Sequence, residues 1–178
     1  MPMDILLLGG PRFLGRALIE AALAAGHNVT IFNRGRTNPH LFLQVERLQG
    51  DRAGQLDALA GRRWDVVIDT CGYVPRLVRQ SAGVLAPNVA HYLFISSISV
   101  YREPIAPSAA ENAPLAVLAD PAVEEVTGET YGGLKALCEQ AVQDVYGERA
   151  LIIRPGLIVG PHDPTNRFTY WVTRMAAG

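Results

Sequence analysis

The chain has 178 residues, a length typical of one domain. Hydrophobic residues make up 49% of it and charged residues 19%, which supplies a buried core and excludes a disordered chain. The net charge of −1 argues against a protein built chiefly to bind nucleic acid or an anionic membrane. No apolar run approaches the ~18–20 residues of a membrane span, and no secretion signal is recognisable. The two cysteines are too few for a disulfide framework, so we expect a cytoplasmic protein without a membrane anchor.

Short apolar runs alternate with longer stretches of helical pattern. The runs are mostly unbroken, as in parallel strands covered on both faces, and lie at 5–8, 29–32, 66–68, 92–95 and 151–153, with a less apolar candidate at 45–48. Helical patterns lie at 13–25, 77–85 and 128–146, the first followed by Gly26 as a left-handed cap. The first two strands and their helix predict a right-handed βαβ unit. We therefore expect an α/β fold with a Rossmann-like, doubly wound, mostly parallel sheet flanked by helices.

Residues 103–120 form a Pro- and Ala-rich stretch without a clear period. Pro104, Pro107 and Pro114 each block regular structure there. A connection of this length inside a compact domain is usually functional, so we expect a functional loop.

A glycine-rich turn follows the first predicted strand and opens the first helix. In dinucleotide-binding turns, three glycines permit the bend, let the backbone approach the pyrophosphate, and let helix and strand pack closely. The helix N-terminus then offers N–H groups and positive charge to phosphates. Arg12 replaces the middle glycine and is suited to bind a phosphate bidentately. The predicted cofactor residues of the turn are Gly9, Gly10, Arg12, Phe13, Leu14 and Gly15. The alternative is an ordinary strand-to-helix turn.

The end of the second strand bears on the choice of cofactor. An NAD site usually has Asp or Glu about 20 residues past the glycines, whereas an arginine nearby accommodates the 2′-phosphate of NADP. Here the strand ends in Asn33, Arg34 and Arg36, and Arg34 stands 19 residues beyond Gly15. With Arg12 expected to converge on the same spot, we predict NADP(H) over NAD(H). The alternative is a set of solvated surface arginines.

Asp51 and Arg52 follow the third predicted strand. We expect Asp51 to accept a hydrogen bond from the adenine amino group and include Arg52 in the cofactor site. An ordinary surface aspartate in a turn explains the pattern equally well.

Tyr131 and Lys135 stand four residues apart in a predicted helix and so share one face. An ammonium beside a phenol favours the phenolate, which suits proton transfer at neutral pH, and Lys135 is also placed to hold the ribose hydroxyls of the nicotinamide half. Ser97 follows the strand at 92–95, at the edge where open α/β sheets bind ligands, and is placed to donate to a substrate oxygen. We predict Ser97, Tyr131 and Lys135 as the catalytic set. The alternative is a serine capping the strand end and a buried tyrosine satisfied by the backbone.

Together these motifs, followed by Arg154-Pro155-Gly156 and Gly160-Pro161, resemble the extended short-chain dehydrogenase/reductase superfamily, of the NAD-dependent epimerase/dehydratase type. The resemblance covers essentially the whole chain. It implies hydride exchange between a nicotinamide and a carbinol or ketone, commonly on a nucleotide-linked sugar, with Ser97, Tyr131 and Lys135 catalytic. It also implies that the cofactor is bordered by Thr70, Cys71, Gly72, Pro155 and Gly156.

The Gly-Gly-x-Arg-Phe turn is more typical of an atypical branch, similar to isoflavone-reductase-like proteins and chloroplast stem-loop RNA-binding proteins. In the RNA-binding group the Tyr/Lys pair is eroded. Here the pair is intact, which favours an oxidoreductase or epimerase/dehydratase. The second hypothesis is a non-catalytic module on the same fold that senses a dinucleotide or binds RNA.

The remaining features complete the hypothesis. The four histidines show no metal-ligand spacing, so no metal site is predicted, and Cys71 is expected to be a packing residue because no histidine lies near it in sequence. The chain ends in a helix-like stretch soon after its last strand. We therefore expect residues 1–178 to be the dinucleotide-binding part of a longer enzyme whose C-terminal substrate lobe is absent. The expected partners are the dinucleotide and a small-molecule substrate, and a homo-oligomer is left open.

Overall fold

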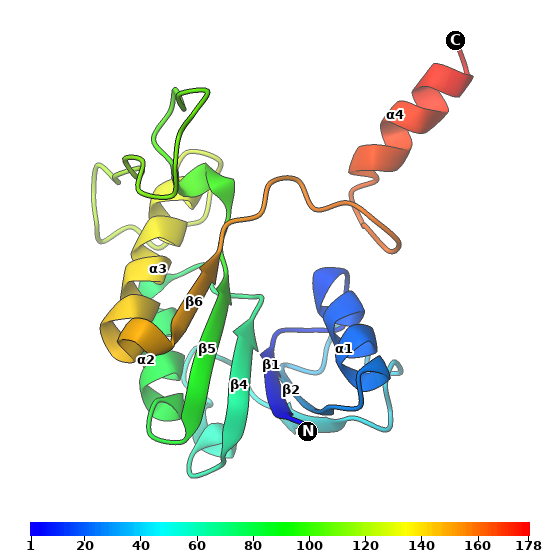
Figure 1. Cartoon of the computed structure of the whole chain (residues 1–178), viewed down its shortest axis with the longest axis vertical. Helices are drawn as coiled ribbons and strands as arrows, with labels where there is room; N and C mark the ends of the chain where they lie inside the picture. The colour runs from blue at the N-terminus through cyan, green and yellow to red at the C-terminus, as the bar shows by residue number, and fades with distance from the viewer.

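The computed structural model describes residues 1–178, and its six strands form one parallel sheet in the order β3-β2-β1-β4-β5-β6 (Figure 1). The strands are β1 (Asp4–Leu8), β2 (Asn28–Asn33), β3 (Glu46–Gln49), β4 (Trp64–Asp69), β5 (Val89–Ile95) and β6 (Ala150–Ile153). The helices are α1 (Leu14–Ala24), α2 (Pro75–Leu85), α3 (Tyr131–Tyr146) and α4 (Arg167–Ala176), and short 3₁₀ turns lie at η1 (Asp57–Leu59), η2 (Ile98–Val100) and η3 (Gly147–Arg149). The Rossmann-like prediction is confirmed.

The predicted elements are all present, with shifted ends. The candidate at 45–48 is strand β3, and Gly26 has the positive φ of +79° expected of a helix cap. The predicted helix at 128–146 begins only at Tyr131. The reason is a local turn in which Thr130 Oγ1 donates to the Glu125 carbonyl and accepts from the Thr127 N–H, so these groups are not available to a helix. Residues 103–120 form no helix or strand, as predicted, apart from an isolated bridge between Tyr101 and Leu115.

The two faces of the sheet carry different helices, because successive strand residues point to opposite faces. In β1, Leu6 and Leu8 join a core with residues of α2 and α3, whereas Leu7 joins Ile19 of α1 in a second, smaller core. Figure 1 accordingly shows α2 and α3 together on one face and α1 on the other. The dominant core therefore lies under α2 and α3.

The direction in which successive strands are added to the sheet reverses at β1. Strands β2 and β3 extend it from one side of β1, and β4, β5 and β6 extend it from the other. In open α/β sheets ligands bind at the carboxyl ends of the strands beside such a reversal. The fold therefore places the expected site above the ends of β1 and β4.

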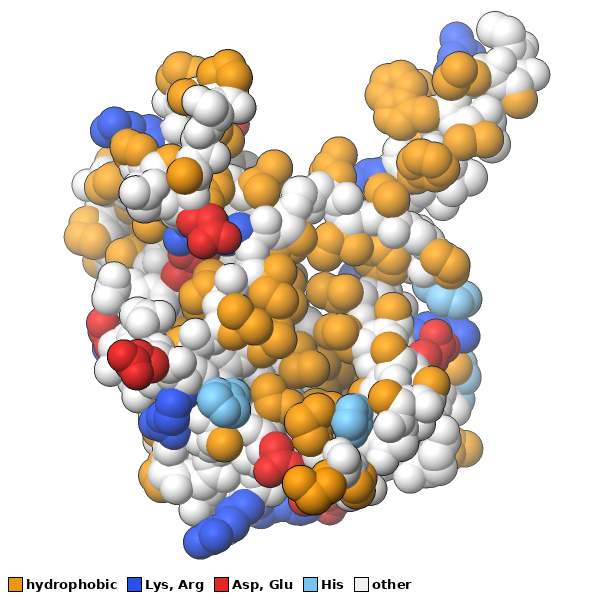
Figure 2. Space-filling view, viewed as in Figure 1, with side chains coloured by type: hydrophobic (Ala, Val, Ile, Leu, Met, Phe, Trp, Pro, Cys, Tyr) orange, Lys and Arg blue, Asp and Glu red, His pale blue; other side chains and the backbone are white.

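Helix α4 projects from the body at the end of an extended segment that follows β6 (Figure 1). It has no buried residue, and its exposed apolar side chains are Phe168, Tyr170, Trp171, Val172 and Met175. Figure 2 shows hydrophobic side chains along this helix and also over the middle of the body. Leu151 and Ile153 of β6 are among the exposed apolar side chains. No helix combines the length and the apolar character that crossing a bilayer requires.

Candidate functional site

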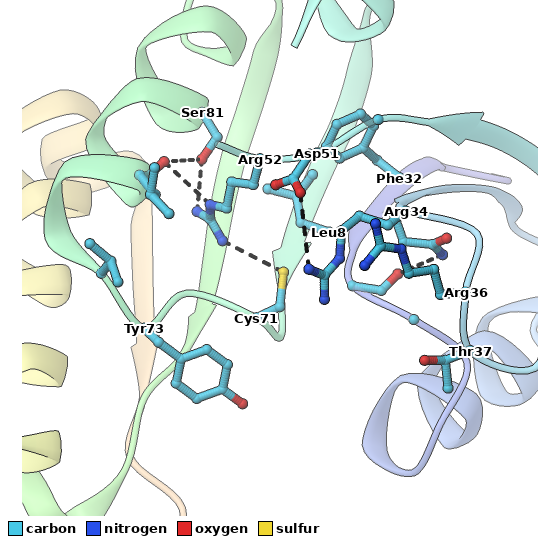
Figure 3. Close-up of a pocket in the computed structure, with 16 residues that line it drawn as sticks. Leu8, Phe32, Arg34, Arg36, Thr37, Asp51, Arg52, Cys71, Tyr73 and Ser81 are labelled. Carbon is cyan, nitrogen blue, oxygen red and sulfur yellow. Dashed lines mark hydrogen bonds and ion pairs between the residues drawn. The ribbon is translucent and has the colours of Figure 1, made fainter. Parts of the chain in front are cut away.

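Two neighbouring cavities lie at the carboxyl edge of the sheet. The first cavity, of about 340 Å³, lies at the ends of β2 and β3 (Figure 3). The second cavity, of about 670 Å³, lies between the glycine-rich turn, the end of β5 and the start of α3. Both are lined by Gly10, Cys71 and Tyr73, so they meet at a neck formed by these residues. Together they form one groove across the reversal of the sheet.

The glycine-rich turn is shaped by the close approach of its own backbone. Gly9 has φ +133°, and a Cβ there would overlap the hydroxyl of Thr70. A Cβ on Gly15 would overlap the Gly10 carbonyl, so the start of α1 packs directly on the turn. At Gly10, by contrast, a Cβ would meet nothing closer than 4.0 Å, and the space beside it opens to both cavities. This bare backbone at a helix N-terminus fits a pyrophosphate group.

The first cavity contains the residues at the end of β2. Asn33 closes the turn: its side-chain amide donates to the Gly9 carbonyl (3.1 Å) and its side-chain oxygen accepts from the Gly35 N–H (2.7 Å). Arg34 and Arg36 line the cavity, and an Arg34 Nη lies 4.0 Å from a carboxylate oxygen of Asp51 across it (Figure 3). The structure does not bring Arg12 into the same cavity as these two arginines, because Arg12 lines only the second cavity.

Arg52, predicted as a cofactor residue, points into the floor of the first cavity. Its guanidinium pairs bidentately with Asp69 at 2.8 and 2.6 Å and donates to Ser81 of α2 at 2.7 Å (Figure 3 shows the arginine and serine). Burial opposes the ionisation of Asp69, but the charge and hydrogen bonds of Arg52 hold its pKa below the usual value. Arg52 therefore joins the end of β3 to β4 and α2, and its charge is already paired.

Cys71 lies beside this pair, with its Sγ 3.7 Å from an Arg52 nitrogen. Burial, reinforced by the charge of Asp69, raises the pKa of the Cys71 thiol to about 11. The side chain is therefore a thiol at neutral pH, as expected of a packing residue rather than a nucleophile.

The second cavity brings together Ser97, Tyr131 and Lys135. Two glycines at the start of α3 allow this: Gly132 lies against the Ser99 carbonyl and Gly133 against Leu118, where a Cβ would overlap either neighbour. Ser97 accepts a hydrogen bond from the Ser99 N–H and donates to the Ser99 hydroxyl, both at 3.1 Å. The hydroxyl of Ser97 is thus held at the end of β5.

Lys135 is almost fully buried and is oriented by backbone carbonyls. Its ammonium donates to Gly72 at 2.8 Å and Ile95 at 2.7 Å, and lies 4.1 Å from the centre of the Phe94 ring. Burial lowers the pKa of Lys135, although Asp69 acts in the opposite direction. An ammonium has three N–H donors, so one remains for a group in the cavity.

The other predicted residues fall around the same groove. Thr70, Phe13 and Leu14 line the second cavity, and so do Pro155 and Gly156 on the segment after β6. The remaining one, Gly72, lines neither cavity and contributes its carbonyl to Lys135.

Sequence reasoning missed Tyr73, which lines both cavities. The only signal for it was its position directly after the segment 69–72 at the end of β4. Sequence reasoning also missed Thr37 in the first cavity, and Thr165 and Arg167 in the second.

Comparison with known protein families gives a match over nearly the whole chain. Residues 5–178 match the family described as NAD dependent epimerase/dehydratase. The chain belongs to this family. The match includes both cavities and extends over α4.

Individual relatives of this epimerase/dehydratase-family chain are distant. It is 31% identical over 126 residues to the chloroplast stem-loop binding protein of 41 kDa b of Arabidopsis thaliana. This match covers 61% of the chain and 33% of the Arabidopsis protein. The Bordetella bronchiseptica enzyme WbmG, solved with NAD and UDP, is 17% identical with a TM-score of 0.77 over 100% of the chain and 61% of WbmG. A UDP-galactose 4-epimerase is 20% identical, with a TM-score of 0.68 over 99% of the chain and 63% of that enzyme. The two solved structures show a shared fold, and the chain spans less than two thirds of each relative.

Proposed function

We propose that this chain binds a nicotinamide dinucleotide along the groove, with the adenosine half in the first cavity and the nicotinamide half in the second. The observation that carries the proposal is the neck, where the open backbone of Gly10, in the turn that leads into α1, lies between the two cavities. A dinucleotide has its pyrophosphate at its centre, so this arrangement matches the order of its parts.

We further propose that NADP(H) is preferred over NAD(H). Strand β2 ends in an amide, Asn33, which is occupied in closing the turn, rather than in a carboxylate. Arg34 and Arg36 line the first cavity and offer positive charge to a 2′-phosphate. The family and the WbmG structure are named with NAD, so this preference would distinguish the chain from that relative.

In the proposed reaction the bound nicotinamide donates or accepts a hydride. The Ser97 hydroxyl turns its hydrogen away from Ser99 to donate to the oxygen of a carbinol or ketone, and Tyr131 takes the proton from that oxygen or returns it. Lys135, oriented by the Gly72 and Ile95 carbonyls, uses its remaining N–H toward the ribose hydroxyls or Tyr131. The proposed activity is that of an oxidoreductase or epimerase/dehydratase, and a nucleotide-linked sugar is the proposed substrate class.

Replacing the proton carrier tests this mechanism. Tyr131→Phe removes one oxygen and keeps the ring, so we expect turnover to be abolished while cofactor affinity stays within a few-fold. The assay follows nicotinamide absorbance with a panel of nucleotide sugars and simple carbonyl compounds, and calorimetry gives the affinity. Full activity in Tyr131→Phe would remove Tyr131 from the mechanism.

A second candidate is a binding module that holds a dinucleotide or RNA without redox chemistry. It is supported by the name of the Arabidopsis relative, a stem-loop binding protein. Binding of a stem-loop RNA that weakens steeply with salt and is competed by NADP⁺, together with no turnover on the whole panel, would favour it.

A further inference from the structure

Tyr73 occupies the neck between the two cavities, on the loop that joins β4 to α2. Gly10 of the glycine-rich turn also lines both cavities, so it lies at the same junction. Figure 3 shows the Tyr73 ring extending from its loop into the open space beside Cys71, with the hydroxyl at its far end. Any ligand that fills both cavities must pass this side chain.

The ring of Tyr73 is held in place by two neighbours. Its centre lies 6.4 Å from that of Tyr131, at an interplanar angle of 39°, and 5.3 Å from the ammonium of Lys135. The residue nevertheless keeps 45% of its surface exposed. The ring is therefore positioned by packing while the hydroxyl stays accessible to a ligand.

The phenol is a hydrogen-bond donor at neutral pH. Burial, reinforced by Tyr131 and Cys71, raises the pKa of Tyr73 above 10, although Arg12 acts in the opposite direction. Arg12 lines the second cavity together with Tyr73.

We infer that Tyr73 contacts the pyrophosphate of the bound dinucleotide, donating its hydroxyl hydrogen to a phosphate oxygen. This inference rests on the proposed dinucleotide binding. It follows from position, because the part of the ligand beside Gly10 is the pyrophosphate, and Tyr73 lines both cavities at the same junction as Gly10. The chain then binds the pyrophosphate both with backbone N–H groups and with a neutral phenol.

The test uses Tyr73→Phe, which keeps the ring that covers Lys135 and removes only the hydroxyl. Calorimetric titration with ADP-ribose, which contains the adenosine and pyrophosphate but no nicotinamide, measures binding separately from catalysis. A hydrogen bond to a charged group predicts that affinity for ADP-ribose falls about tenfold. The same loss is expected for NADP⁺.

Tyr170→Phe in α4 is the matched control, because it makes the same chemical change outside both cavities. It should bind ADP-ribose like the unaltered chain, and both variants should unfold at the same temperature as that chain. Affinity of Tyr73→Phe within about twofold of the unaltered chain would overturn the inference and leave Tyr73 as a cover for Lys135. If the unaltered chain itself binds neither ADP-ribose nor NADP⁺, the proposed function fails as well, and the two failures are thus distinguishable.

Discussion

Asp69 and Arg52 form the most enclosed ion pair of the site. Their side chains are 0% and 11% exposed, and Asp69 also accepts a hydrogen bond from Tyr92 at 2.7 Å. A charge buried at this depth is tolerated because its partner neutralises it, so removing one partner leaves the other uncompensated. The pair lies at the floor of the first cavity, where it joins the segment after β3 to β4 and, through Ser81, to α2.

We therefore expect Asp69→Asn to lower the free energy of unfolding by about 3–5 kcal/mol at neutral pH. Because the folded-state pKa of Asp69 lies below its ordinary value of 3.8, its contribution is present above that pH and is lost as the pH falls further. The stability difference between the unaltered chain and the variant should therefore shrink below about pH 3.8. Urea denaturation across this range measures it, with Asp144→Asn in the exposed pair with Arg79 as a control of small effect. Equal losses in both variants would contradict the buried-pair account.

Individual residues differ in how far sequence predicts them. Gly9, Gly15, Tyr131 and Lys135 belong to short local patterns whose spacing already implies a turn or a helix face. The Arg52–Asp69 pair was not predictable in this way, because it depends on two parallel strands on opposite sides of β1. Tyr73 was missed for a related reason: its importance comes from lining both cavities together with Gly10, a residue in a different βα turn.

At the scale of elements, the start of α3 determines how near Tyr131 comes to Ser97. Gly132 lies against the carbonyl of Ser99, so a methyl group there forces α3 and η2 apart. A second connection lies further along α3, where Glu139 pairs with Arg154 after β6 at 2.7 Å, and Arg154 also donates to Tyr101 at 3.0 Å. The helix is thus fastened to the segments on both sides of the second cavity.

Gly132→Ala should accordingly destabilise the fold by about 1–3 kcal/mol, as expected when a group is added to a filled contact. Gly83→Ala, in the middle of α2, is a control for which we expect the opposite effect on stability, because a Cβ there meets nothing within 4 Å. The gain in helix propensity should stabilise that variant by about 0.5–1 kcal/mol. Chemical denaturation of both proteins compares them, and a stabilised Gly132→Ala would show that α3 is not held by this contact.

The sequence predicted the order of the helices and strands better than the residues at which they begin and end. The apolar runs predicted five of the six strands because both faces of this sheet's central strands are covered, whereas the edge strand β3 gave only a less apolar pattern. The start of α3 was misplaced because the hydroxyls of Thr127 and Thr130 compete for backbone groups, an effect that hydrophobic periodicity does not report.

At the scale of the whole molecule, one groove joins the end of β2 to the start of α3 across the reversal point of the sheet. Its shape depends on elements distant in sequence, whereas its chemical groups lie in local motifs. The segment after β6 also reaches the second cavity, through Pro155, Gly156 and Arg167 at the start of α4. The account therefore predicts a single ligand that spans both cavities.

Calorimetric titration of NADP⁺ and NAD⁺ into the 178-residue chain measures whether one dinucleotide fills both cavities. We expect saturable binding of one equivalent of dinucleotide, with NADP⁺ binding more tightly than NAD⁺. Tighter binding of NAD⁺ would contradict the assigned role of Arg34 and Arg36. Absence of saturable binding by either dinucleotide at millimolar concentration would contradict the account of the groove itself.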